Sequence, residues 1–174
     1  HMAFPGTISL EESTFAAVLR DYVRSLARHG FRRICVIPSH GGNFAPLAAA
    51  VEKLPPEHRG QVTAITDLGV FLRIAQLGDE EFGVPLSEGG LHAGEWETSM
   101  LLAIHPDLVH MDRAEAGYVG DPEAAIGSLF SAGVDSISEN GAIGDPKQAA
   151  VEHGRRYWDA ALDLAVEAAE TGRR

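Results

Sequence analysis

Apolar residues recur every three or four positions between Ser9 and Gly30, which is the spacing of one face of an α-helix. Ser9 and Glu12 have the spacing of a capping box, in which two side chains bond backbone N–H groups at the start of a helix. Gly30 is a typical end signal. We therefore predict an amphipathic helix whose apolar positions are Leu10, Phe15, Val18, Leu19, Tyr22, Val23 and Leu26.

Two short runs further along predict β-strands. Residues 33–38 are rich in β-branched side chains, and residues 61–66 alternate between polar and apolar positions. Between the two runs, Ser39-His40-Gly41-Gly42-Asn43 predicts a loop, residues 44–53 predict an alanine-rich helix, and residues 54–60 predict a linking loop. This part of the chain is therefore expected to run from strand through glycine loop and helix to a second strand.

The second half of the chain has a weaker pattern. Residues 68–90 predict a short helix followed by an acidic, glycine-rich loop. A helix is expected over residues 94–104, ending before His105-Pro106 because the residue preceding proline avoids the helical region. Residues 108–111 predict a strand. Residues 112–144, with frequent glycines and little periodicity, predict mostly a loop.

An apolar stripe that runs toward Ala169 predicts a last helix, with Pro146 in its first turn. Helices that alternate with short apolar strands predict an α/β class, layered as α/β/α around a mainly parallel sheet. With 174 residues, 45% of them hydrophobic, one domain over residues 3–174 is expected. We interpret His1-Met2 as a cloning remnant.

Charge and composition narrow the classes of partner. The chain carries 14 Lys and Arg against 25 Asp and Glu, a formal net charge of -11, which argues against nucleic acid as a partner. No apolar stretch approaches the roughly 20 residues of a membrane-spanning helix, and no targeting segment is recognised, so we expect a cytoplasmic protein without membrane contact. The single cysteine, Cys35, excludes an intrachain disulfide and a thiolate metal cluster.

His40 is the first candidate for chemistry. It follows a predicted strand and precedes Gly41 and Gly42, which would let the backbone approach a ligand closely. A metal or anion site fits this position. A tight strand-to-helix turn with a surface histidine fits it as well, and this segment alone favours the turn.

His92 is the second candidate, three residues before Glu95 and five before Glu97. Imidazole and carboxylate groups suit a divalent ion such as zinc or manganese. On a helix that begins near Gly94, the two glutamates point to different faces, so we expect one to be a ligand and the other to support it or cap the helix. The alternative is a capped helix with acidic residues at its positive end.

Three blocks of sequence point to one family when they are taken together. The first joins Phe4-Pro5-Gly6-Thr7 to His40-Gly41-Gly42-Asn43 by way of Leu26-Ala27-Arg28-His29-Gly30. The second runs from His92-Ala93-Gly94-Glu95 through Glu97-Thr98-Ser99, and the third is Gly144-Asp145-Pro146 before the last helix. In this order, and over nearly the whole chain, they resemble the creatininase family of metal-dependent amidohydrolases.

The resemblance implies a two-metal site and a metal-activated water that attacks the carbonyl of a carbon–nitrogen amide bond. It implies that His40 binds metal and that His92 passes a proton to the leaving nitrogen. Creatininase carries a metal-binding glutamate where this chain has Gly42, and we expect Glu95 to supply the missing carboxylate. Glu97 is then a supporting or structural residue.

The loop after His40 is expected to act through its shape: Gly41 and Gly42 form it, and the amide of Asn43 orients it. The implied cofactor is a divalent metal, which we expect to be zinc or manganese, or else iron. The implied partners are a small-molecule amide substrate and further copies of the chain, because the family commonly forms closed homo-oligomers. Creatinine is not the first choice, because Ser87-Glu88-Gly89-Gly90 lacks the tryptophan of the creatinine enzymes. Other relatives act on formamide groups or on peptide bonds of modified precursor peptides.

Two features depart from the family pattern. Pro38-Ser39 replaces the usual Asn-Gly before the histidine, and the Glu-x-His block expected before Phe4 is absent. That block holds and bridges the metals, so we expect the N-terminal part of the fold to be missing and metal binding to be impaired. Two alternatives stay open. One is a non-catalytic binding or assembly subunit that keeps the fold. The other is a small-ligand α/β domain whose glycine loop cradles an anion, although no nucleotide-binding motif is present.

Overall fold

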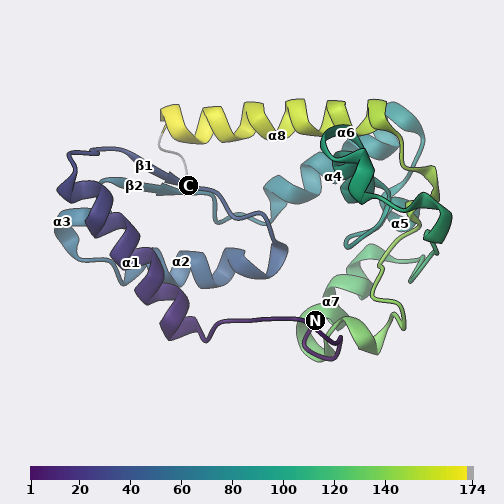
Figure 1. Cartoon of the computed structure of the whole chain (residues 1–174), viewed down its shortest axis with the longest axis horizontal. Helices are drawn as coiled ribbons and strands as arrows, with labels where there is room; N and C mark the ends of the chain where they lie inside the picture. The colour runs from purple at the N-terminus through teal and green to yellow at the C-terminus, as the bar shows by residue number, and fades with distance from the viewer. Residues whose placement is uncertain (172–174) are drawn as a thin grey trace. The chain divides into compact units, whose positions relative to one another are not determined.

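The computed structural model describes residues 1–171. Contacts between residues divide the chain into two compact units (Figure 1). Unit 1 consists of His1–Ile8 and Leu72–Ala161, and unit 2 consists of Ser9–Phe71 and the chain from Leu162 onward. The expectation of one domain over residues 3–174 stays a prediction. No helix among the described residues is both long and apolar enough to cross a membrane.

Unit 2 contains the sheet. Two strands, β1 (Ile34–Val36) and β2 (Val62–Ala64), pair in parallel with Ile34 opposite Val62. A connection between parallel strands has to cross back over the sheet, and here it contains a 3-10 turn and two helices. The helices of this unit are α1 (Glu12–Arg28), α2 (Phe44–Glu52) and α3 (Pro56–Arg59).

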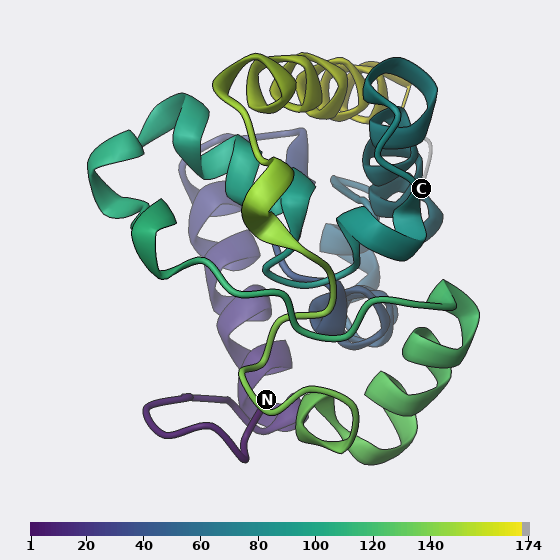
Figure 2. The ribbon, with the colours of Figure 1, turned by 90° about the vertical axis from the view of Figure 1, so that its right-hand side faces the viewer.

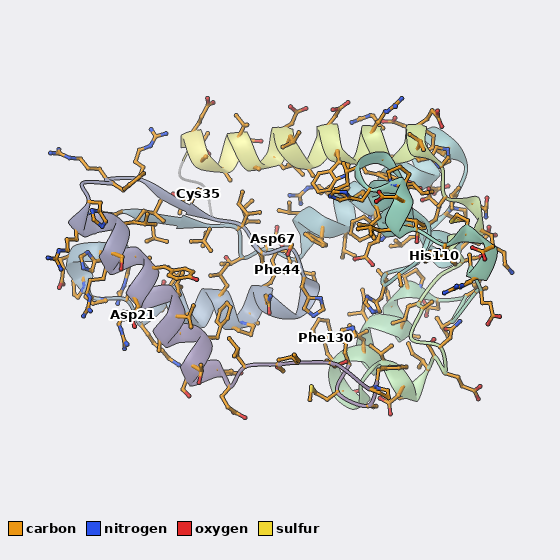
Figure 3. The ribbon with its side chains drawn as sticks, viewed as in Figure 1. Asp21, Cys35, Phe44, Asp67, His110 and Phe130 are labelled. Carbon is orange, nitrogen blue, oxygen red and sulfur yellow. The ribbon has the colours of Figure 1, made fainter. Side chains whose placement is uncertain are left out.

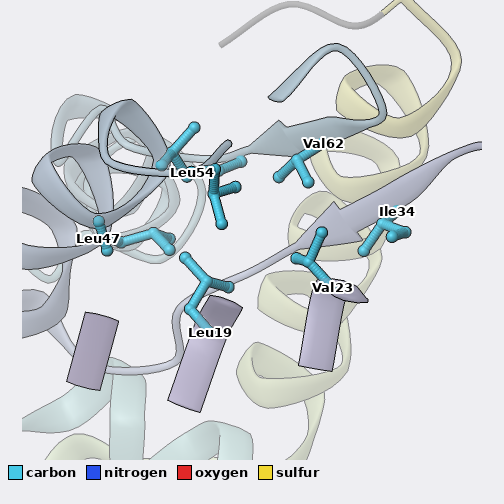
Figure 4. Close-up of a cluster of buried hydrophobic side chains, with 9 residues drawn as sticks. Leu19, Val23, Ile34, Leu47, Leu54 and Val62 are labelled. Atoms are coloured by element: carbon cyan, nitrogen blue, oxygen red, sulfur yellow. The ribbon is translucent and has the colours of Figure 1, made fainter. Parts of the chain in front are cut away.

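The core of unit 2 lies between α1, α2 and the sheet (Figure 4). Leu19 and Val23 stand one helical turn apart on α1 and are both buried. They pack with Ile34 of β1, Val62 of β2 and Leu47 of α2. Burial of each such side chain stabilises the fold by roughly 1.5–3 kcal/mol, so the period of the apolar positions decides which face of α1 turns inward.

A second cluster in unit 2 joins Phe44, at the start of α2, to Ile65 after β2 and to Ala168 near the end of α8 (Val151–Thr171). The ring of Phe44 meets that of Phe71 edge to face, with centroids 5.2 Å apart. Asp67 lies close to this cluster (Figure 3). Its Oδ1 accepts a hydrogen bond from the backbone N–H of Gly69 at 2.8 Å, at the start of the next helix.

Unit 1 is helical, and Figure 2 turns it toward the viewer. The start of α8 lies beside the end of α4 (Gly69–Phe82), and the two are joined by an ion pair between Arg156 and Glu81 at 2.8 Å (Figure 1). Trp158 of α8 donates its indole N–H to the carbonyl of Met100 at 2.9 Å. The other helices of this unit are α5 (Leu86–Gly89), α6 (Glu95–Ile104) and α7 (Pro122–Ala132).

Several predicted elements are confirmed. Helices form at α1, α2, α6 and α8, strands form at β1 and β2, and the α/β class with a parallel sheet is correct, although the sheet has two strands. The capping box is wrong: Glu11 occupies the N-cap position of α1, and the Ser9 hydroxyl bonds the carbonyl of Leu10. Pro146 opens a 3-10 turn, Pro146–Gln148, and α8 begins only at Val151.

Four other predictions needed correction. Residues 108–111 form no strand, because two 3-10 turns, Pro106–Leu108 and Met111–Arg113, take up this segment. The predicted loop over 112–144 contains α7, which opens with Asp121 as a capping acceptor and Pro122 in its first turn. The linker at 54–60 contains α3, and α4 is a full helix of 14 residues where only a short one was expected.

Candidate active site

His92 lies between α5 and α6, where its backbone is fixed by an antiparallel bridge to Ile143. The N–H of His92 donates to the carbonyl of Ile143 at 3.2 Å, and the N–H of Ile143 donates to the carbonyl of His92 at 2.7 Å. The side chain of His92 is 33% exposed. The ring of His1 meets it edge-on, with centroids 4.5 Å apart. His92 is therefore held by its backbone while its imidazole is open to solvent.

The turn that follows His92 is tight. Ala93 has a φ of 50°, in the left-handed region that residues with a Cβ rarely adopt. A Cβ on the next residue, Gly94, would lie 2.1 Å from the carbonyl oxygen of Gly89, so only glycine fits there. This conformation lets the N–H of Ala93 donate to Oε2 of Glu97 at 2.6 Å.

Glu97 lies beside His92. Its Oε2 is 3.8 Å from Nδ1 of His92, and its side chain is 33% exposed. Burial raises the pKa of the Glu97 carboxyl, and the hydrogen bond from Ala93 lowers that pKa in part. An imidazole and a carboxyl group this close can share or relay a proton. The structure thus forms an accessible pair from His92 and Glu97, which the spacing of five residues did not predict.

Glu95, the first residue of α6, has a different environment, because its side chain is only 1% exposed. Oε1 accepts a hydrogen bond from the hydroxyl of Ser99 at 2.7 Å and lies 2.8 Å from Nδ1 of His153. Oε2 accepts a hydrogen bond from the hydroxyl of Tyr157 at 2.7 Å. The donors come from α6 itself and from α8, and they surround the carboxylate.

The partners of Glu95 are themselves held in place. The ring of Phe82 stacks on that of His153, with centroids 3.8 Å apart and planes 11° apart. The hydroxyl oxygen of Ser99 accepts from the N–H of Ala150 at 3.0 Å. The pKa of Tyr157 is raised, first by burial and then by its hydrogen bond to Glu95 and the negative charge of that group. Tyr157 therefore stays a neutral donor.

His40 belongs to unit 2, where it precedes a 3-10 turn formed by Gly41–Asn43. The N–H of Asn43 donates to the carbonyl of His40 at 3.0 Å. A Cβ on Gly42 would lie 2.9 Å from Nε2 of His40, so this glycine makes room for the imidazole. Asn43 occupies the N-cap position of α2 but forms no capping bond through its side chain. Its predicted orienting role stays a prediction.

The expected metal ligands differ in their surroundings. Within residues 1–171, no group of three or more His, Cys, Asp or Glu side chains is arranged to hold a metal ion. Both carboxylate oxygens of Glu95 already accept hydrogen bonds, so this side chain does not fit the ligand role expected for it. His92 and Glu97 provide an accessible nitrogen and carboxylate. The described residues therefore fit a part of a metal site and not a complete one.

Two residues of this region were missed by the sequence analysis. His153 and Tyr157 both contact the buried Glu95. They are four positions apart and so lie on one face of α8. A polar pair at this spacing on an otherwise apolar stripe was the available signal, but it does not identify the partner.

Comparisons with known proteins identify relatives of the chain. A mycofactocin precursor peptide peptidase of Mycobacterium ulcerans (strain Agy99) is 34% identical over 167 residues, which are 95% of this chain and 59% of that protein. A creatinine amidohydrolase of Pseudomonas putida is 36% identical over 121 residues, 63% of this chain and 45% of that protein. The chain thus spans less than two thirds of the length of these relatives.

Solved structures agree on the fold. A mutant creatininase of Zn-Zn type aligns with a TM-score of 0.69 and 24% identity, and a creatininase in a manganese form with 0.64 and 23%. Each alignment covers 98% of this chain and 68% of the solved one. The family model described as creatininase, creatinine amidohydrolase, matches residues 1–169. The chain therefore belongs to the creatininase family.

Proposed function

We propose that this chain forms part of a metal-dependent amidohydrolase that cleaves a carbon–nitrogen amide bond. The observation that carries the proposal is the accessible pair of His92 and Glu97, held at a tight turn in a chain that the creatininase model matches over residues 1–169. The names of the two relatives support the reaction class, because one is a peptidase and the other an amidohydrolase. Both reactions break a carbon–nitrogen bond.

His92 is proposed as the proton donor. Amide hydrolysis adds water to the carbonyl carbon, breaks the carbon–nitrogen bond and requires a proton on the leaving nitrogen. Glu97 lies 3.8 Å from Nδ1 of His92, and we propose that the imidazole, with this carboxyl group beside it, gives a ring proton to that nitrogen. The fixed backbone of His92 would hold the imidazole in place while the bond breaks.

A divalent metal, when bound, would polarise the carbonyl and activate the attacking water. His40 is kept as a proposed metal ligand. The expectation that Glu95 provides the carboxylate is disfavoured by its three bonds and its burial, whereas Glu97 is one-third exposed. We propose Glu97 as the carboxylate that a metal can reach. Zinc or manganese is the proposed ion, in line with the Zn-Zn and manganese forms of the solved relatives.

The proposed substrate is a small amide or the amide bond of a short peptide, and the similarity to a precursor peptide peptidase favours the peptide. The proposed setting is the cytoplasm, and the proposed assembly is a homo-oligomer. A second candidate is a binding or assembly subunit without activity. It is favoured by one observation, that residues 1–171 hold no cluster of three or more metal-binding side chains.

An activity assay separates the two candidates. The chain is incubated with zinc or manganese and a panel of small amides and short peptides, and released amine is measured. Amide hydrolysis that falls about 100-fold or more in His92→Asn supports the enzyme, because general acid catalysis contributes on that order. Glu115→Gln is the matched control, since Glu115 is exposed and outside the site. Equal background rates in all three proteins would support the binding subunit.

A further inference from the structure

We infer that Glu95 is a positioning residue: its buried carboxylate fastens the start of α8 to the first turn of α6 and thereby fixes the loop that presents His92 and Glu97. The inference rests on the proposed function for what that loop does, but the fastening itself rests on the contacts of Glu95 alone. It gives Glu95 a role different from that of a metal ligand.

The first support is the number of donors. Oε1 has the Ser99 hydroxyl at 2.7 Å and Nδ1 of His153 at 2.8 Å, and Oε2 has the Tyr157 hydroxyl at 2.7 Å. A carboxylate offers about four acceptor positions, so most of them are filled. A metal ion would have to displace one of these donors, and the displaced group would then be left unpaired in a buried place. The surroundings are therefore complete without a metal.

The second support is the origin of the donors. His153 and Tyr157 are one turn apart on α8, and Ser99 is one turn beyond Glu95 on α6. Ser99 also accepts from the N–H of Ala150, directly before α8. The backbones of the two helices touch here, because a Cβ on Gly154 would lie 1.8 Å from the carbonyl oxygen of Ser99. One carboxylate thus organises the contact between α6 and α8.

A third helix, α4, packs against the same buried site around Glu95. Phe82 stacks on His153, and its ring meets that of Tyr157 edge to face with centroids 5.8 Å apart. A Cβ on Gly78 would lie 2.9 Å from the Tyr157 hydroxyl and 3.8 Å from Oε2 of Glu95. A side chain at this position would push the tyrosine off the carboxylate. The space around the carboxylate is therefore shaped from all three helices.

The link to the loop runs through the backbone. Glu95 directly follows the tight turn of Ala93 and Gly94, and Glu97 is two residues further along the same helical turn. The short hydrogen bond from Ala93 to Glu97 requires both ends of this turn to be fixed. Ile143 holds the end at His92, and the bonds of Glu95 hold the other end. Loosening Glu95 should therefore weaken the bond between Ala93 and Glu97.

The test compares three variants of the full chain, Glu95→Gln, Tyr157→Phe and Glu97→Gln, with Glu115→Gln as the exposed control. Three quantities are measured on each folded variant: the amide proton resonance of Ala93, the hydrogen exchange rate of Ala93, and the zinc bound per chain when zinc alone is titrated. The Ala93 resonance reports the loop itself, so a general loss of stability does not move it.

In Glu95→Gln we expect the Ala93 resonance to move upfield and its exchange to become about tenfold faster, with zinc uptake equal to that of the unaltered chain. Tyr157→Phe keeps the carboxylate and should give the same two changes, which covers the case in which Glu95→Gln does not fold. An unchanged Ala93 resonance in the folded variants overturns the inference. So does zinc uptake lost in Glu95→Gln and kept in Glu97→Gln. If neither the unaltered chain nor any variant binds zinc, the proposed function fails. The Ala93 measurements still decide the inference in that case.

Discussion

The hydroxyl of Tyr157 donates a hydrogen bond to Oε2 of Glu95 at 2.7 Å, and the two side chains are 0% and 1% exposed. A carboxylate is costly to bury unless donors surround it, and Tyr157 is one of three donors that do so. Because Tyr157 lies on α8 and Glu95 on α6, this bond joins the C-terminal helix to the helix that opens beside His92.

Removal of the tyrosine hydroxyl should destabilise the protein. Tyr157→Phe keeps the ring and its packing on Phe82 but leaves Oε2 of Glu95 without its donor. We expect the free energy of unfolding to fall by about 1.5–3 kcal/mol, as for a buried bond to a charged group. Urea denaturation measures this, with Tyr22→Phe as the control because Tyr22 is 69% exposed. Equal unfolding midpoints for the two variants would contradict the buried bond.

The raised pKa of Tyr157 predicts a loss of stability in alkali. The folded state holds the phenol neutral, whereas in the unfolded chain it ionises near its ordinary pKa of about 10. The stabilisation is therefore fully present below that pH and declines as the pH rises above it. Unfolding free energies measured from pH 8 to 11 should fall less steeply in Tyr157→Phe than in the unaltered chain. Parallel curves would show that Tyr157 is not buried as described.

The raised pKa of Glu97 predicts a variant that gains stability, relative to the unaltered chain, as the pH rises from acid to neutral. Burial disfavours the ionised carboxylate, so the contribution of Glu97 to stability is present in acid and is lost as the pH rises through its folded pKa. Glu97→Gln should therefore be more stable, relative to the unaltered chain, at pH 7 than at pH 4. Thermal unfolding at the two pH values measures the difference. A variant whose relative stability is higher at pH 4 would reverse the predicted sign.

Two helical glycines form a matched pair for packing. A Cβ on Gly154 would lie 1.8 Å from the carbonyl of Ser99, whereas a Cβ on Gly127 of α7 meets nothing within 4 Å. Gly154→Ala should lower the free energy of unfolding by about 3 kcal/mol through overpacking. Gly127→Ala should raise it by about 0.5–1 kcal/mol, because alanine is the better helix former. Similar effects of the two variants would argue against direct contact between α6 and α8.

Local signals explain which elements were predictable. The apolar positions of α1 recur with a clear helical period, and α6 ends at a clear stop signal before Pro106. The strands β1 and β2 are bounded by turn residues. The helix α7 was predictable as well, since Asp121, Pro122 and Gly133 mark its ends, but the frequent glycines around it suggested a loop. The expected strand at 108–111 was too short for its pattern to distinguish a strand from turns.

The candidate site was less predictable. The approach of Glu97 to His92 depends on the positive φ of Ala93, which no spacing rule indicates. The partners of Glu95, His153 and Tyr157, stand 58 and 62 positions away, so their contact follows from how α8 packs and not from the local sequence. The resemblance to a known family drew attention to the segment that holds Glu95 and Glu97. The structure distinguishes these two glutamates, because Glu95 is buried and Glu97 is partly exposed.

Metal content tests the proposed function most directly. The chain is purified without chelator, beside His40→Ala, Glu97→Gln and the exposed control Glu115→Gln, and bound metal is measured by elemental analysis. Because the described residues form only a part of a metal site, the account predicts partial occupancy by zinc or manganese in the unaltered chain and the control, and a loss of metal in both site variants. Absence of metal from the unaltered chain, or equal metal in all four proteins, would contradict it.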